Sequence, residues 1–151
     1  MLFLAVAVIS CAPQPVIIVE AEVQGVVEGF FEALDVDNED PNLLDLYVTE
    51  DFIIYEMGKK MTRQEFKELI SEDSPATSSE WQLSDYRIST DLNSAHASFK
   101  NNGIFEVNMD SFKVRYNYEW LESAYLVKAN DRLKIKFYFS DNLHISADTI
   151  R

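Results

Sequence analysis

The chain has 151 residues, of which 47% are hydrophobic and 13% aromatic, and its formal net charge at pH 7 is −13. This length is typical of one domain, and the composition is sufficient for a sizeable core. A surface with so much negative charge repels phosphate backbones, so we expect no nucleic-acid partner and no charge-driven attachment to anionic lipid.

The N-terminus has the pattern of an export signal. Residues 1–10 are almost wholly apolar and end in Ser10, a small residue. A run of about ten residues is too short to cross a bilayer, whose core needs roughly 20. Val8-Ile9-Ser10-Cys11 resembles the lipobox of bacterial lipoproteins, in which the cysteine is acylated. No Lys or Arg follows Met1, so either the charged start of such a signal is missing or the true start lies upstream.

This resemblance implies a division of the chain into a signal peptide (1–10), a lipid-anchor linker (11–15) and one domain (16–151). The protein would then be held in the bacterial cell envelope through acylated Cys11. The alternative is an ordinary buried N-terminal strand or helix with a free thiol.

Helices are predicted in the first half of the domain. Apolar residues recur at spacings of three and four between Val19 and Leu34, which indicates an amphipathic helix. Residues 35–41 form a polar loop whose carboxylates lack the glycine and glutamate spacing of a calcium-binding loop, so we expect a solvated loop. A second, short helix is predicted at 42–47.

A strand, a helix and then a series of strands follow. Residues 51–57 predict a short strand, followed by Gly58 and a turn that contains Lys59 and Lys60. Thr62 and Glu65 have the spacing of a capping box, which predicts a helix that ends by Pro75. After a loop at 74–79, four long strands are predicted at 81–90, 95–105, 112–128 and 133–140. Helices followed by an antiparallel series of strands are typical of an α+β domain with a strongly bent sheet.

Alternation along the strands predicts which face is buried. On the last strand, Phe137 and Phe139 alternate with Tyr138, which falls on the wet side. The apolar sides of the strands, closed by the helices, should enclose a cone with an aromatic inner wall. We assign seven residues to a ligand pocket in this cone: Phe30, Ile54, Trp81, Tyr116, Tyr118, Trp120 and Phe137. The alternative is that these rings simply fill the core.

Over about residues 16–145 the chain resembles the SnoaL-like branch of the nuclear transport factor 2-like superfamily. The resemblance is carried by three stretches: Val27-Glu-Gly-Phe-Phe-Glu-Ala-Leu34, the strand-turn-helix from Asp51 to Phe66, and the last hairpin from Tyr125 to Ser140. These are patterns of hydrophobicity and turn placement, not a catalytic fingerprint. The resemblance implies a cone-shaped α+β fold, in which a strongly bent antiparallel or mixed sheet wraps around N-terminal helices. It also implies a pocket at the open end of the cone.

Because this fold hosts many activities, the activity must be sought in site residues. A steroid-isomerase-like site needs a tyrosine on the first helix, where this chain has Phe30 and Phe31. A dehydratase-like site needs an inward-facing histidine, and neither His96 nor His144 is well placed for that role. No catalytic triad, phosphate-binding loop or metal motif is present, so we expect no cofactor and no metal.

The remaining catalytic candidates are carboxylates in phase with aromatic positions, namely Glu56, Glu122 and Asp85. If Glu56 and Glu122 both point into the cone, burial would raise their pKa values and they could act as an acid/base pair. The alternative is that these carboxylates lie at the rim and are satisfied by water or arginine.

Two functions remain open at this point. The favoured one is an exported, lipid-anchored domain that binds a small apolar ligand or a protein partner and catalyses nothing. The other is a SnoaL-like lyase or isomerase that uses a pocket carboxylate as general base on a hydrophobic substrate. Two or more titratable groups within hydrogen-bond reach at the pocket floor would favour the enzyme, and an all-apolar floor would contradict it. A filled cone would indicate a purely structural envelope protein, and the wet face around Tyr125 and Tyr138 suits a homodimer contact, as the resemblance implies.

Overall fold

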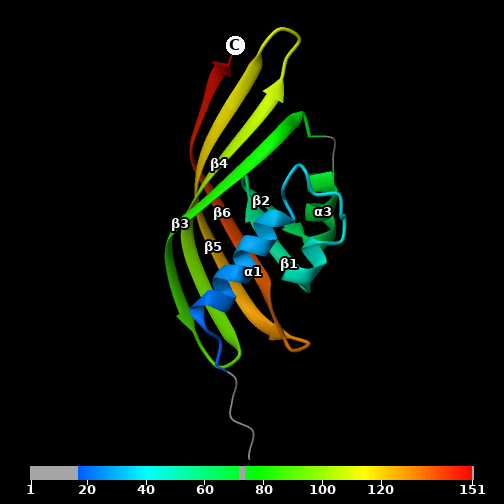
Figure 1. Ribbon diagram of the computed structural model, residues 1–151. Helices are drawn as coiled ribbons and strands as arrows, with labels where there is room; N and C mark the ends of the chain where they lie inside the picture. The colour runs from blue at the N-terminus through cyan, green and yellow to red at the C-terminus, as the bar shows by residue number, and fades with distance from the viewer. Residues whose placement is uncertain (1–16, 72–73, 151) are drawn as a thin grey trace, which may run out of the picture.

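A curved six-stranded sheet with the strand order β2-β1-β6-β5-β4-β3 forms the centre of the computed structural model, which describes residues 17–71 and 74–150. Neighbouring strands run antiparallel except β1 and β6, which are parallel. The helices lie on one side of the sheet, and the far ends of β4, β5 and β6 extend beyond them (Figure 1). The elements are α1 (Glu20–Glu32), α2 (Leu44–Tyr47), β1 (Val48–Glu56), β2 (Lys59–Thr62), α3 (Arg63–Ser71), β3 (Ala76–Thr90), β4 (Ser94–Asn108), β5 (Lys113–Ala129) and β6 (Arg132–Ile150). The predicted α+β class, with a bent mixed sheet around N-terminal helices, is confirmed.

The order of elements follows the sequence prediction, with three differences. The two-lysine segment after Gly58 forms the strand β2, which was expected to be a turn. Strand β3 begins at Ala76, inside the expected loop, and β6 continues to Ile150, ten residues past its expected end. The predicted capping box is present, because the Thr62 amide donates to Glu65 Oε2 at 2.8 Å and the Glu65 amide donates to Thr62 Oγ1 at 3.4 Å.

The core lies between α1 and the concave face of the sheet. Phe30 of α1 is 1% exposed, and its ring packs at 4.8 Å from Tyr138 of β6 and at 6.1 Å from Phe66 of α3. Val23, Val27 and Phe31 extend this contact along α1. Large rings fill this part of the cone, so the hollow expected there is absent from the described residues and open space lies elsewhere.

Two irregularities change which face several side chains occupy. Strand β3 shifts register against β4 between Ser84 and Arg87, and Asp85 has a φ of 55°. Strand β6 shifts register against β5, because Tyr125 pairs with Phe137 whereas Leu126 pairs with Ile135. An extra residue on one strand moves every later side chain to the opposite face. The predicted orientations of Asp85, Phe137 and Tyr138 are therefore wrong.

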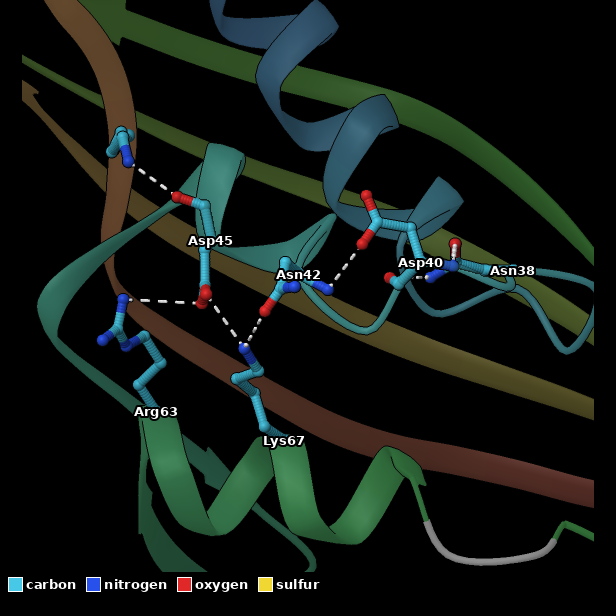
Figure 2. A network of polar contacts seen from close by, with 7 residues as sticks. Asn38, Asp40, Asn42, Asp45, Arg63 and Lys67 are labelled. Carbon is cyan, nitrogen blue, oxygen red and sulfur yellow. Dashed lines mark hydrogen bonds and ion pairs between the residues drawn. The ribbon is translucent and has the colours of Figure 1, made fainter.

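A polar network ties α2 to α3 and so holds the hairpin of β1 and β2 from both ends. Asp45 of α2 forms ion pairs with Arg63 at 3.4 Å and with Lys67 at 2.9 Å, both on α3 (Figure 2). The backbone oxygen of Asp45 accepts a hydrogen bond from Lys134 of β6 at 2.7 Å. Lys67 also reaches Asn42 Oδ1 at 3.5 Å. The network therefore connects the open end of the hairpin to β6.

Candidate functional site

A cleft of about 600 Å³ opens where β1 ends beside β6. The last paired residues of these strands are Tyr55 and Phe139. Beyond them the chain turns away at Met57 and Gly58, which both have positive φ, while β6 runs on for eleven more residues. The resulting notch is lined by Tyr55, Glu56, Met57, Gly58, Lys59, Lys60, Trp120, Phe139, Ser140, Asp141 and Asn142.

Glu56 is the carboxylate of β1 that lies on the inner side of this cleft. It follows Phe52 and Ile54 in the alternation of β1, and both of these residues are 1% exposed. Burial raises the pKa of Glu56, and no hydrogen bond from the described residues opposes that effect. Glu56 is therefore a partly desolvated carboxylate that a ligand in the cleft can touch.

Glu122 lies behind the cleft wall, directly opposite Ser140 in the pairing of β5 with β6. It is 5% exposed and accepts a hydrogen bond from Asn101 Nδ2 at 3.4 Å. Burial raises the pKa of Glu122 to about 7, and the negative charge of Glu56 contributes to the rise. Asn101 and Ser140 oppose the rise, but desolvation is the larger effect.

Burial raises the pKa of both carboxylates, and at Glu122 the negative charge of Glu56 adds to this effect. Glu122 holds its proton up to about pH 7, and Glu56 is the member of the pair that a ligand in the cleft can reach. One negative charge in this apolar environment costs less than two, and a pair of carboxylates with separated pKa values can supply both an acid and a base. The structure brings Glu56 and Glu122 together on the inner face of the sheet.

Several buried polar atoms of the core, among them those of Glu122 and of its neighbours Asn101 and Tyr138, have no hydrogen-bond partner among the described residues. They are Trp81 Nε1, Tyr86 Oη, Asn101 Oδ1, Glu122 Oε2 and Tyr138 Oη. Tyr138 is close enough to Glu122 to affect the pKa of that carboxyl. Burial, together with the charge of Glu122, raises the pKa of Tyr138 well above its usual value. Buried polar groups in folded proteins are nearly always paired, so a cluster of unpaired ones is typical of a functional site.

The aromatic wall of the cleft is built from Trp120 and its neighbours. The Trp120 ring stacks on Tyr118 with centroids 4.9 Å apart and an angle of 4° between the planes. It also lies over Gly103, where a Cβ atom would meet Trp120 Cζ3 at 2.6 Å. The ring centroids of Trp81 and Trp120 are 6.2 Å apart, and Trp81 continues the aromatic wall toward Phe31 of α1. Glycine at position 103 is therefore what allows the indole to lie flat against the sheet.

The other predicted site residues lie away from the cleft. Phe30 and Ile54 are each 1% exposed and belong to the core, and Tyr116 is half-buried further along β5. Phe137 lies on the outer face, where its ring packs edge-on against Tyr55 at 5.2 Å. Asp85 points into solvent and forms an ion pair with Lys100 at 2.7 Å, which lowers the pKa of Asp85.

Four residues around the site were missed by the sequence prediction: Tyr138, Asn101, Ser140 and Lys59. Tyr138 was assigned to the wrong face because the register shift in β6 is not visible in the hydrophobic pattern. Asn101 alternates with the buried residues Phe99 and Ala97 on β4, so its inward orientation could have been predicted from the sequence. Cys11 lies outside the described residues.

Neither histidine joins the site. His96 and His144 are exposed, and His96 lies within 2.9 Å of Ser123 Oγ on the outer face. Within residues 17–71 and 74–150, no group of three or more His, Cys, Asp or Glu side chains is arranged to hold a metal ion. No helix in the same ranges is long and apolar enough to cross a membrane.

Comparisons with known proteins identify the fold. No protein-family model matches the sequence, and no curated protein matches it. Among solved structures, a hexachlorocyclohexane dehydrochlorinase of type 2 has a TM-score of 0.71 at 8% identity, over 84% of this chain and 86% of that one. A CaMKII hub from S. rosetta has a TM-score of 0.64 at 16% identity, over 82% and 95% of the two chains. An NTF2-like protein from Cytophaga hutchinsonii has a TM-score of 0.59 at 14% identity, over 83% and 100%.

These identities are too low to carry an activity from one chain to the other. The lengths covered and the TM-scores do identify the architecture over most of the chain. The protein therefore has the fold of the nuclear transport factor 2-like proteins.

Proposed function

We propose that the protein is an acid–base enzyme of the lyase or isomerase type, and that it acts on a small, largely apolar molecule bound in the cleft. The observation that carries this proposal is a pair of interacting carboxylates, the half-buried Glu56 on the cleft wall and the buried Glu122 behind it. A titratable group on the cleft wall that interacts with a second one behind it supports the enzyme over the non-catalytic binder. One structural neighbour is named as a dehydrochlorinase, which shows that this fold can host an elimination reaction.

In the proposed reaction, Glu56 is the general base. Its carboxylate takes a proton from a carbon of the substrate, and the electron pair of that C–H bond forms a new double bond. In a lyase the leaving group departs with its bonding electrons, and in an isomerase Glu56 returns the proton to another carbon. Desolvation strengthens Glu56 as a base, because a carboxylate with a raised pKa holds the transferred proton more firmly. The neutral Glu122 keeps a second negative charge out of the site.

The test uses nitrobenzisoxazole, a flat aromatic molecule that ring-opens to a coloured phenolate when a base removes its C–H proton. We expect the wild-type protein to accelerate this reaction and Glu56→Gln to lower the rate by about 10²- to 10⁴-fold, which is the usual contribution of a general base. Glu50→Gln is the matched control, because Glu50 is an exposed carboxylate of the same strand. Equal rates for wild type and Glu56→Gln, with the probe bound by both, would contradict the proposed enzyme and would support the non-catalytic binding domain.

For the location of the protein, we propose export and acylation at Cys11, which would hold the domain at the bacterial cell envelope. The support is the apolar run followed by Val8-Ile9-Ser10-Cys11. Expression in a bacterial host with a radioactive fatty acid should label the wild-type protein in the membrane fraction, whereas Cys11→Ala should carry no label. An unlabelled wild-type protein would contradict the anchor.

For the partner, we propose a homodimer through the outer face of the sheet. Tyr55, Leu121, Tyr125 and Phe139 are each about 40% exposed there, and together they form an apolar surface with the half-buried Phe137. Leu121→Lys should shift the sedimentation of the protein from dimer to monomer, because a lysine at the centre of an apolar contact loses its hydration. Leu92→Lys, in the turn between β3 and β4, is the control. A wild-type monomer at all concentrations would refute the dimer.

A further inference from the structure

The mouth of the cleft carries the first two basic residues of the chain. Residues 1–58 contain twelve acidic side chains and no Lys or Arg, and Lys59 and Lys60 follow immediately. In the hairpin Glu56 pairs with Lys59 and Tyr55 pairs with Lys60. Paired residues of an antiparallel hairpin point to the same face, so Lys59 lies on the side of Glu56 and Lys60 on the outer side of Tyr55.

Lys59 has no partner among the described residues, although the chain is strongly acidic. Other basic side chains pair with carboxylates: Arg63 and Lys67 with Asp45, Lys100 with Asp85, Lys113 and Arg115 with Glu106, and Lys136 with Asp51. Glu56 stands directly opposite Lys59 but does not form an ion pair with it, and Lys59 does not offset the effect of burial on Glu56. The ammonium group of Lys59 is therefore available to an anion in the cleft.

The opposite wall of the same cleft is aromatic. The Trp120 indole is held by its stack on Tyr118 and by the absence of a side chain at Gly103, so its orientation is fixed before any ligand arrives. Phe139 and Met57 add apolar surface at the mouth, where they are 42% and 83% exposed. A flat ring in the cleft would cover these groups from water, which is favourable in proportion to the apolar area buried.

We propose that the ligand of the cleft is a small aromatic carboxylate, whose ring lies against Trp120 and whose carboxylate pairs with Lys59. This inference rests on the proposed function, because it places the substrate beside Glu56. A monoanion fits better than a phosphate dianion, since Asp141 and Glu56 line the same cleft and would repel a second negative charge. With Lys59 holding the acid group, a C–H bond of the ring substituent lies toward Glu56.

The experiment measures the binding of naphthoate and of uncharged naphthamide by isothermal titration calorimetry. These two molecules have the same ring and differ in charge. We expect wild-type protein to bind naphthoate about tenfold more tightly, the effect of one charge-assisted contact of about 1.4 kcal/mol. Lys59→Gln should abolish the preference, and Lys59→Arg should keep most of it. Lys113→Gln is the control, because it removes the same charge from an exposed lysine of β5 that does not line the cleft.

Three results would overturn the inference. They are equal affinity of wild type for naphthoate and naphthamide, equal loss of the preference in Lys59→Gln and Lys113→Gln, and an undiminished preference in Lys59→Gln. None of these touches the proposed acid–base function, which depends on Glu56 and is tested by the rate of the nitrobenzisoxazole reaction. Conversely, a preference for naphthoate that depends on Lys59, in a protein that does not accelerate that reaction, would support the ligand class and overturn the enzyme.

Discussion

Glu122 makes the stability of the protein depend on pH, and Glu122→Gln should remove that dependence. In the folded protein the pKa of Glu122 is raised from its ordinary value of 4.5 to about 7. Below the lower value the carboxyl is protonated in both the folded and the unfolded chain, so it has no effect. As the pH rises between the two values, the unfolded chain ionises while the folded one does not, and stability falls. Above the higher value the loss is constant at about 3 kcal/mol.

The measurement is urea unfolding, followed by tryptophan fluorescence from about pH 4 to about pH 8, for wild type and Glu122→Gln. Glutamine keeps the size of the side chain and cannot ionise. The free energy of unfolding of Glu122→Gln minus that of wild type should therefore increase by about 3 kcal/mol across this range. Taking the difference removes the effect of most other titrating groups, which both proteins share. Glu119→Gln is the control, because Glu119 is an exposed residue of the same strand and should give a flat difference.

A flat difference for Glu122→Gln as well would refute the reasoning, because it would mean that Glu122 ionises in the folded protein as it does in water. An increase that occurs below about pH 5 would have the same meaning, since ordinary glutamates titrate there. A positive result would identify Glu122 as the protonated member of the carboxylate pair.

Three further substitutions test the surroundings of the site. Gly103→Val should displace the Trp120 ring, lower stability by about 1–3 kcal/mol and weaken naphthoate binding; unchanged binding would mean that the fixed indole is not part of the cleft. Asp45→Ala removes both ion pairs between α2 and α3, and it should lower the free energy of urea unfolding by about 1–2 kcal/mol; a neutral result would show that the network does not hold the hairpin. Tyr138→Phe should change stability by less than about 1 kcal/mol, because its hydroxyl has no hydrogen-bond partner within residues 17–71 and 74–150; a loss above about 2 kcal/mol in the same assay would reveal a strong hydrogen bond.

The sequence predicted those parts of the fold that depend on long, regular patterns. The apolar spacing from Val19 to Leu34 predicted α1, and the alternation of the later strands predicted a bent sheet with an apolar inner face. The capping box at Thr62 and Glu65 is set by local chemistry and was also predictable. These features could be predicted because many residues contribute to each pattern.

The sequence could not predict where that pattern is interrupted. The register shifts at Asp85 in β3 and before Phe137 in β6 each leave the composition unchanged while reversing the face of the residues beyond them. The prediction of the candidate site is affected most, because the shift in β6 places Tyr138 on the inner face of the sheet and Phe137 on the outer face. Glu56 and Glu122 precede or avoid the shifts, so alternation alone put both in phase with aromatic positions and made them candidates, although it left open whether they lie in the cone or at its rim. Lys59 forms no ion pair with Glu56, which stands directly opposite it in the hairpin, and this depends on side-chain geometry that no local sequence pattern encodes.

The β1–β2 hairpin ends before β6 does, and this difference in length sets the width of the cleft. Because β6 continues past Phe139 with one edge uncovered, two additional residues at the end of β1 would pair with Asp141 and its neighbours and close the gap. A shorter β1 would widen it. Insertions and deletions at Met57 and Gly58 therefore change the width of the cleft, while Glu122 on β5 keeps its place behind it.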